Sequence, residues 1–104
     1  MQNPQLIDTV FFWLKEDTTA AQKSAFEDGL RSLATISSVQ SCYFGPPAGT
    51  PRAVVDNSYD YALNVNLESS EKHDLYQDDP IHHAFIAAHK DIWARVQVYD
   101  NLVR

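Results

Sequence analysis

The sequence has a single cysteine, Cys42, which excludes an intrachain disulfide framework and a zinc site built from several cysteines. Basic residues are also scarce, since 8 Lys and Arg stand against 14 Asp and Glu and give a net charge of -6. Nucleic acids and anionic membranes both attract cationic surfaces, so we expect neither as a partner. No segment approaches the ~20 apolar residues that span a bilayer, and residues 1–5 lack the basic head and apolar stretch of a signal peptide. A reducing cytoplasm is the expected location.

Sequence motifs of several enzyme classes are also missing. The chain contains no Walker loop, GxGxxG, GxSxG or HExxH motif, and Cys42 has no basic neighbour in sequence that would favour its thiolate. His82 and His89 share a face of a predicted helix, but they are about 10.5 Å apart along its axis, too far for one zinc ion. The acidic residues Asp78 and Asp79 are more typical of a solvated turn than of a cation site. We therefore predict no metal site and no cofactor.

The composition is that of one folded domain. Its 104 residues are 44% hydrophobic and 12% aromatic, which supplies one core and leaves too little chain for a second. Residues 1–104 are therefore assigned to a single domain.

Periodicity and capping signals divide this domain into strands and helices. Residues 19–22 fit a capping box that starts a helix, in which Phe26, Leu30 and Leu33 form the buried stripe. Residues 59–67 alternate with the period of 2 that is typical of a strand. The predicted elements are strand 6–15, a helix from 19, strands 39–44 and 59–67, helices 69–76 and 80–93, and strand 95–100. This order predicts an α+β fold, a ferredoxin-like βαββαβ monomer whose four-stranded antiparallel sheet carries its helices on one face.

The first predicted strand and the longest predicted loop both indicate self-association. Strand 6–15 is largely apolar on both faces, although helices cover only one face of such a sheet. A second copy of the chain is the simplest cover, because closed twofold dimers are the commonest homo-oligomers. The loop 45–58 is long for a compact domain, which favours a lid or a dimer arm carrying Val54 and Val55. We therefore predict a homodimer.

Four histidines are the first candidates for chemistry, because histidine is easily poised for proton transfer near neutral pH. The predicted helix 80–93 has two stripes side by side. The apolar stripe consists of Ile81, Phe85, Ala88 and Ile92, and the second stripe consists of His82, Ile86, His89 and Trp93. A pair of His82 and Tyr76 at a pocket wall would exchange a proton with a carbonyl or a phenol, so we predict both as catalytic residues. The alternative for His82 is a structural histidine at a helix start. His73 and His83 are expected to face solvent.

Asp8 interrupts an apolar strand on the face that also carries Phe12. A buried carboxylate requires a partner. If Asp8 lines a pocket, a bound ligand would be that partner, which would give the residue a functional role. The alternative is an exposed strand end. We expect a ligand pocket lined by apolar residues of the sheet and helices together with this acid, namely Asp8, Phe12, Leu30, Tyr61, Leu63 and Trp93.

Five stretches of the chain carry a recognisable pattern: TVFFWLK at 9–15, VVDNSYDYAL at 54–63, LES at 67–69, YQDDPIH at 76–82 and WARVQVYD at 93–100. Together they cover nearly the whole chain and resemble the stress-responsive A/B barrel, or Dabb, domain family. The resemblance implies a ferredoxin-like monomer that dimerises, with two sheets closing into an α+β barrel.

The resemblance also implies a site. The family includes plant stress-induced proteins and a plant polyketide cyclase that closes a linear polyketide by intramolecular aldol chemistry without a cofactor. By motif position, the tyrosine and histidine of that cyclase look like Tyr76 and His82 here, with Trp93 nearby. The family usually has histidine where this chain has Asp8, and a further strand histidine of the cyclase falls at Tyr61, so the cavity polarity differs.

The combined expectation is a homodimer that binds a small, partly apolar carbonyl or phenolic compound, with cofactor-free chemistry of a cyclase or lyase kind. One alternative is a non-enzymatic stress-responsive domain that acts through self-association or a protein partner, which a filled core behind His82 would favour. Another is a cofactor-free monooxygenase on a similar barrel, for which the sequence has no distinctive residue.

Overall fold

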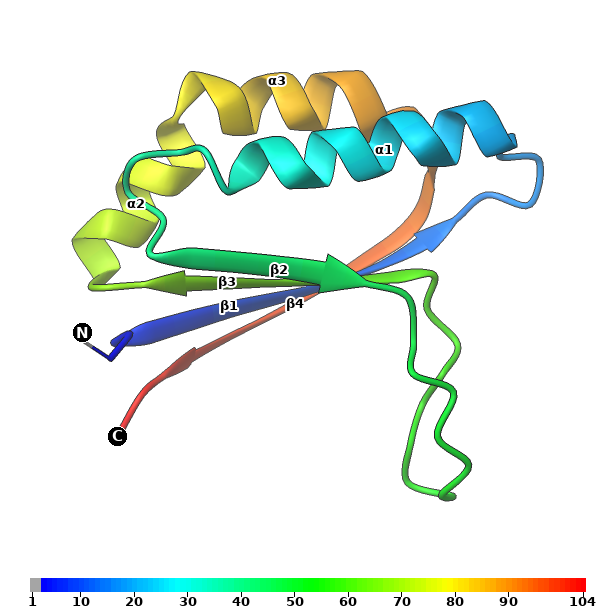
Figure 1. The fold of residues 1–104 in the computed structure, drawn as a ribbon, viewed down its shortest axis with the longest axis horizontal. Helices are drawn as coiled ribbons and strands as arrows, with labels where there is room; N and C mark the ends of the chain where they lie inside the picture. The colour runs from blue at the N-terminus through cyan, green and yellow to red at the C-terminus, as the bar shows by residue number, and fades with distance from the viewer. Residues whose placement is uncertain (1–2) are drawn as a thin grey trace.

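The structure, a computed structural model, describes residues 3–104 as a sheet covered by helices on one face (Figure 1). The elements are β1 (Leu6–Leu14), α1 (Ala20–Leu33), β2 (Ser41–Gly45), β3 (Tyr61–Leu67), α2 (Ser70–Asp78), α3 (Pro80–His89), a 3-10 turn (Lys90–Ile92) and β4 (Trp93–Leu102). The predicted α+β, ferredoxin-like βαββαβ order is confirmed, with α2 and α3 together filling the second helical position. Within the described residues, no helix has both the length and the apolar character needed to cross a membrane.

The sheet is antiparallel with the strand order β2-β3-β1-β4, so β1 lies in the interior. Its register places Asp8 opposite Val65 of β3 and opposite Asp100 of β4. Directly paired residues share a face of the sheet, so both partners lie on the helix side with Asp8. The other face of the sheet has no helix over it (Figure 1).

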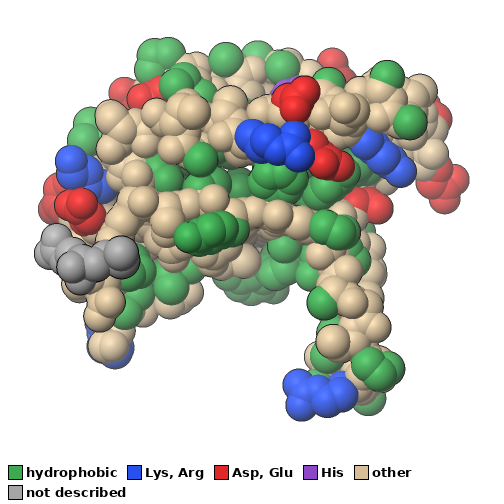
Figure 2. All heavy atoms as spheres, viewed as in Figure 1, with side chains coloured by type: hydrophobic (Ala, Val, Ile, Leu, Met, Phe, Trp, Pro, Cys, Tyr) green, Lys and Arg blue, Asp and Glu red, His purple; other side chains and the backbone are tan. Residues whose placement is uncertain are grey.

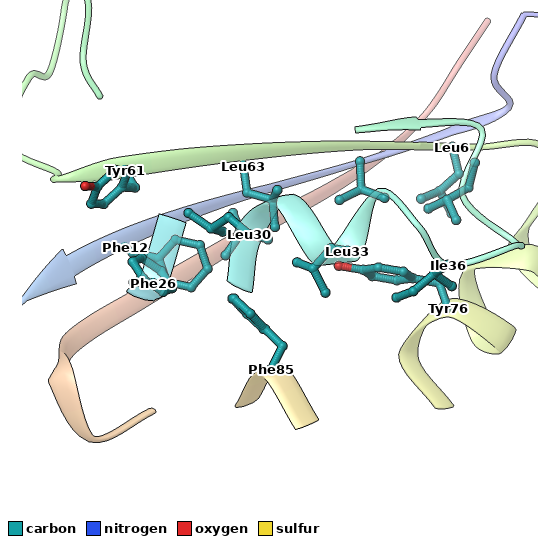
Figure 3. Close-up of a cluster of buried hydrophobic side chains, with 13 residues drawn as sticks. Leu6, Phe12, Phe26, Leu30, Leu33, Ile36, Tyr61, Leu63, Tyr76 and Phe85 are labelled. Atoms are coloured by element: carbon teal, nitrogen blue, oxygen red, sulfur yellow. The ribbon is translucent and has the colours of Figure 1, made fainter. Parts of the chain in front are cut away.

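Helix α1 begins and packs as its sequence predicts. The Thr19 hydroxyl accepts from the Gln22 amide at 3.1 Å, and the Gln22 side chain accepts from the Thr19 amide at 2.8 Å. These reciprocal bonds satisfy two backbone donors that a helix start would leave free. Phe26, Leu30 and Leu33 are wholly buried against the sheet, where they form the centre of the core (Figure 3).

The predicted helix 80–93 is too long at its end. Helix α3 stops at His89, and Trp93 begins β4 instead of lying on a helix stripe. The Lys15 amide donates to the Ile92 carbonyl at 2.8 Å, which draws the chain into the sheet beside β1. The apolar stripe is also only partly buried, since Phe85 is 6% exposed whereas Ile81 is 36% exposed. Helix α3 therefore packs through Phe85, with Ile86 and His89 of the second stripe beside it.

Gly29 allows α1 and α3 to approach closely. A Cβ at this position would overlap the His89 ring and would lie 3.2 Å from Cδ1 of Phe85. Alanine favours a helix by about 1 kcal/mol relative to glycine, but overpacking costs about 1–3 kcal/mol. We expect Gly29→Ala to lower the free energy of unfolding by about 1 kcal/mol in urea titrations. In a His89→Ala background the same substitution should be stabilising, and an equal loss in both backgrounds would contradict this contact as the cause.

The segment between β2 and β3 projects from one end of the sheet, away from the helices (Figure 1), and shows apolar and basic side chains at its tip (Figure 2). Val54 is 83% exposed there. The base of the segment is fixed, since Asp60 accepts from the Leu14 amide at 2.7 Å and Ser58 accepts from the Trp13 indole at 3.1 Å. This geometry suits an arm that reaches beyond the monomer.

Candidate functional site

A cavity of about 180 Å³ lies between the helix side of the sheet and helices α2 and α3. Its lining is mostly apolar and consists of Asp8, Val10, Phe12, Leu63, Tyr76, Gln77, His82, Phe85, Ile86, Trp93, Val96 and Val98. No helix fully covers β4, so Val96 and Val98 remain 39% and 45% exposed and form the open side of the cavity. No residue of the projecting arm lines this cavity, so the arm is not a lid over it.

Three buried side-chain atoms of the cavity lining have no hydrogen-bond partner at standard geometry among the described residues, although the Gln77 backbone lies close enough to the His82 ring, and the Asp100 carboxyl close enough to Asp8, to affect their pKa values. These three atoms are Oδ1 of Asp8, Nδ1 of His82 and Nε1 of Trp93. Buried polar groups are nearly always paired in proteins, and an unpaired one costs about 1–3 kcal/mol. Their gathering in one cavity therefore provides polar contacts for a ligand within apolar walls.

His82 and Tyr76 meet at the wall of this cavity. Their rings lie edge to face with centroids 4.8 Å apart, and Tyr76 is 2% exposed. Burial, followed by the charge on His83, lowers the pKa of His82 from its ordinary value of 6.5, so the imidazole is neutral at pH 7. Burial, followed by the charge on Asp8, raises the pKa of the Tyr76 hydroxyl, which stays protonated. The cavity wall thus carries a neutral base beside a weak acid.

Local sequence explains why these rings meet. Ser69 caps α2 by accepting from the Lys72 amide at 3.1 Å, and Tyr76 lies two turns later on the face toward the sheet. Asp79 then accepts from the Ile81 amide at 2.9 Å and Pro80 occupies the first turn, so α3 starts at once. The sharp turn between the two helices folds His82 back onto α2.

Asp8 is buried and has a partner that the sequence did not indicate. Its side chain is 6% exposed, and its Oδ2 lies 3.1 Å from Nε2 of His73, whose side chain is 12% exposed. The expectation that His73 faces solvent is wrong, because α2 turns this residue toward the sheet, as it does Tyr76. The alternative of an exposed strand end for Asp8 is likewise wrong. Burial and the charge on Asp100 raise the pKa of Asp8 to about 6.

The remaining predicted site residues divide into two groups. Phe12, Leu63 and Trp93 line the cavity, as do Asp8, Tyr76 and His82. Leu30 is wholly buried in the core outside the cavity lining, and the Tyr61 hydroxyl points away to donate to Oε2 of Glu27 at 2.6 Å. His83 is exposed as predicted, with a side-chain exposure of 62%.

Other residues of the lining were missed by sequence reasoning, namely Val10, Gln77, Phe85, Ile86, Val96 and Val98. Phe85 and Ile86 were placed on apolar stripes, and Val10 shares the strand face of Asp8 and Phe12. The signal was present for these three, but the sequence does not distinguish a cavity wall from a packed core.

One protein family matches the sequence pattern of the chain. The family model described as the stress responsive A/B barrel domain matches residues 8–103. No curated protein is similar enough to this chain to count as a relative.

Solved structures share the fold at low sequence identity. A dimeric ferredoxin-like protein from Thermobifida fusca is 22% identical with a TM-score of 0.82, and the match covers 99% of this chain and 94% of that one. A Dabb family protein from Mesorhizobium loti is 18% identical with a TM-score of 0.78, covering 97% and 98%. A hydroxynitrile lyase from Passiflora edulis is 15% identical with a TM-score of 0.80, covering 97% and 95%.

Proposed function

The chain belongs to the stress responsive A/B barrel, or Dabb, family, and within that family we propose that it is a homodimer whose subunits each bind a small aromatic carbonyl or phenolic compound. The observation that carries this proposal is the presence of three unpartnered buried polar atoms in one apolar cavity. A ligand oxygen beside His82 would pair with one of these atoms, and an aromatic ring would contact Phe12, Phe85 and Trp93.

The volume of the cavity limits the size of the ligand. A cavity of ~150 Å³ holds a benzene molecule in another protein, so the 180 Å³ here fits a single substituted ring. An extended polyketide would have to reach out past β4. We therefore favour a one-ring ligand over the chain-like substrate of a cyclase.

The chemistry available at this cavity is proton transfer. Neutral His82 acts as a base or hydrogen-bond acceptor toward a ligand hydroxyl, and the Tyr76 hydroxyl supplies or shares the proton. Both keep these protonation states at neutral pH because burial opposes their charged forms. The hydroxynitrile lyase from Passiflora edulis with this fold supports a lyase reaction on a small hydroxyl or carbonyl compound as the enzymatic form of the proposal.

Homodimerisation is supported by the uncovered face of the sheet. Phe11 lies there with its ring 4.9 Å from that of Tyr59 and 6.2 Å from that of Tyr99, and the Arg95 guanidinium lies 4.3 Å above the Trp13 ring. An aromatic surface of this kind is typical of an interface. The projecting arm extends on the same side of the sheet (Figure 1), where it would reach a second subunit. The Thermobifida fusca protein with this fold is dimeric.

The non-enzymatic alternative predicted a filled core behind His82, and the cavity found there favours ligand binding instead. No residue of the site favours the monooxygenase alternative.

Phenol and toluene, which differ by one hydroxyl in size-matched rings, test the ligand site. We expect phenol to bind wild-type protein at least about 10-fold more tightly than toluene, because His82 accepts a hydrogen bond from the phenol hydroxyl. His82→Ala should remove this preference in calorimetric titrations, His82→Gln should keep part of it because its amide oxygen still accepts a hydrogen bond, and the exposed His83→Gln should leave it intact. Equal affinities for phenol in wild type and both His82 variants would rule out this site.

The same titrations across pH provide a further control. Protonated His82 cannot accept a hydrogen bond, so phenol affinity should be constant from pH 8 to pH 7 and should decline only below 6.5, because the pKa of His82 is lowered. The titratable groups near His82 are His83, His73, Asp79 and Tyr76, and Asp8 lines the same cavity. A decline that persists in His82→Gln would assign the pH dependence to those groups instead.

A further inference from the structure

Three side chains that can ligate a metal come together beside the cavity, each from a different element. Asp8 lies on β1, His73 on α2 and Asp100 on β4, and one ligand atom from each lies within 4.8 Å of the other two. Asp8 and Asp100 are direct partners in the antiparallel register, so their side chains share the helix side of the sheet. His73 approaches from above, with Nε2 at 3.1 Å from Oδ2 of Asp8. Two carboxylates and one imidazole therefore lie close enough together to surround one ion.

A second observation, independent of this clustering, indicates a missing partner. Asp8 is 4% exposed, and its Oδ1 is buried without a hydrogen-bond partner at standard geometry among the described residues. Its partner in the β4 register is Asp100, whose charge and side-chain hydrogen bond both raise the pKa of Asp8, so the two carboxyl groups lie close together with no cation between them. A bound cation would pair with this buried carboxylate oxygen and offset the cost of its burial.

We propose that Asp8, His73 and Asp100 bind one divalent transition-metal ion, with Zn²⁺ as the best fit. The donor set decides the class of ion, because an imidazole nitrogen suits zinc and its neighbours in the first transition row, whereas Mg²⁺ and Ca²⁺ prefer oxygen ligands throughout. The charges also balance, since two carboxylates with a neutral imidazole match a divalent cation. A bound ion would occupy Oδ1 of Asp8 and would leave Nδ1 of His82 and Nε1 of Trp93 as the polar contacts for an organic ligand.

The geometry suits a three-ligand site with an open position. Zinc bonds to nitrogen and oxygen are ~2.0–2.1 Å long, which places adjacent ligand atoms about 3 to 3.5 Å apart. The Asp8–His73 separation of 3.1 Å is already in this range. Asp100 is exposed on the edge strand, so its side chain is free to adjust and the ion can arrive from solvent. Because Asp8 also lines the cavity, an open coordination position would be available to water or to a ligand oxygen there.

Calorimetric titration of chelator-treated full-length protein with Zn²⁺ tests the site directly, without any organic ligand. We expect one ion bound per chain, with much weaker binding of Mg²⁺. Asp8→Asn, His73→Gln and Asp100→Asn should each weaken Zn²⁺ binding at least about 10-fold. Co²⁺ should report the same site by its visible absorption, which the same substitutions abolish.

An exposed pair of a histidine and an aspartate supplies the matched control. His83 and Asp78 lie 3.4 Å apart on the surface, and His83→Gln should leave the affinity for Zn²⁺ unchanged. Circular dichroism would reveal whether a substitution at buried Asp8 prevents folding. In that case Asp100→Asn, which lies on the exposed edge strand, still tests the site. The proposal is overturned if wild type binds no Zn²⁺, or if His83→Gln removes binding while the Asp100 and His73 variants retain it.

Discussion

Replacement of Phe26 by alanine is expected to lower the free energy of unfolding by about 4 kcal/mol. Phe26 is 0% exposed and lies where the sheet and both long helices converge (Figure 3). Its ring centroid is 5.1 Å from that of Phe12, 5.8 Å from that of Phe85 and 6.0 Å from that of Trp93. These three neighbours also line the cavity, so Phe26 supports the cavity wall from behind. Truncation therefore removes apolar burial and leaves a void that rigid aromatic neighbours cannot close.

Urea titration at one fixed protein concentration measures this loss, because dimerisation would make the apparent stability depend on concentration. The exposed Leu75→Ala on α2 is the control and should change the free energy of unfolding by no more than about 0.5 kcal/mol. Benzene should restore part of the stability of Phe26→Ala by filling the void. A loss below about 1 kcal/mol would mean that α1 and the sheet repack around the smaller side chain.

Much of this fold could be predicted because its signals are local. The capping box at Thr19 and the helical spacing of Phe26, Leu30 and Leu33 fix the start and the buried face of α1. The alternation from Tyr61 to Leu67 fixes which residues of β3 face the helices. Each of these patterns lies within one element, so the neighbouring residues alone determine the outcome.

The candidate site could be predicted only in part, because its parts are brought together by tertiary structure. Tyr76 and His82 are close in sequence, and a single turn places their rings together. The contact of Asp8 with His73 depends instead on how α2 lies over β1, and the position of Asp100 depends on the register of β1 with β4. Neither the register nor the placement of the helix is encoded in the spacing of these residues along the chain.

The end of α3 could not be predicted from the sequence either, because tertiary contacts determine it. The apolar spacing continues from Phe85 to Trp93 as a helix would, yet the chain leaves the helix after His89. The backbone hydrogen bond between Lys15 and Ile92 and the pairing of Leu14 with Trp93 determine this ending, and both are contacts with the end of β1 or the residue after it, far away in sequence. Tertiary pairing here outweighs local helical periodicity.

Tyr99→Glu is expected to convert the proposed dimer into a monomer. Tyr99 lies on β4, 60% exposed in the monomer, on the face of the sheet that no helix covers. In a closed twofold dimer the substituted residue occurs twice within the one interface, which would lose two aromatic contacts and bury two unpaired carboxylates. The dissociation constant should rise by at least about 100-fold, which corresponds to roughly 3 kcal/mol.

Sedimentation velocity over a range of protein concentrations measures this change. Leu75→Glu introduces the same charge at a side chain of similar exposure, 58%, on helix α2 away from the uncovered face, and it should remain dimeric. Tyr99 does not line the ligand cavity, so the monomeric variant should still bind phenol if the cavity is complete within one subunit. A wild-type chain that sediments as a monomer at all concentrations would refute the dimer, and a dimer unaffected by Tyr99→Glu would place the interface elsewhere.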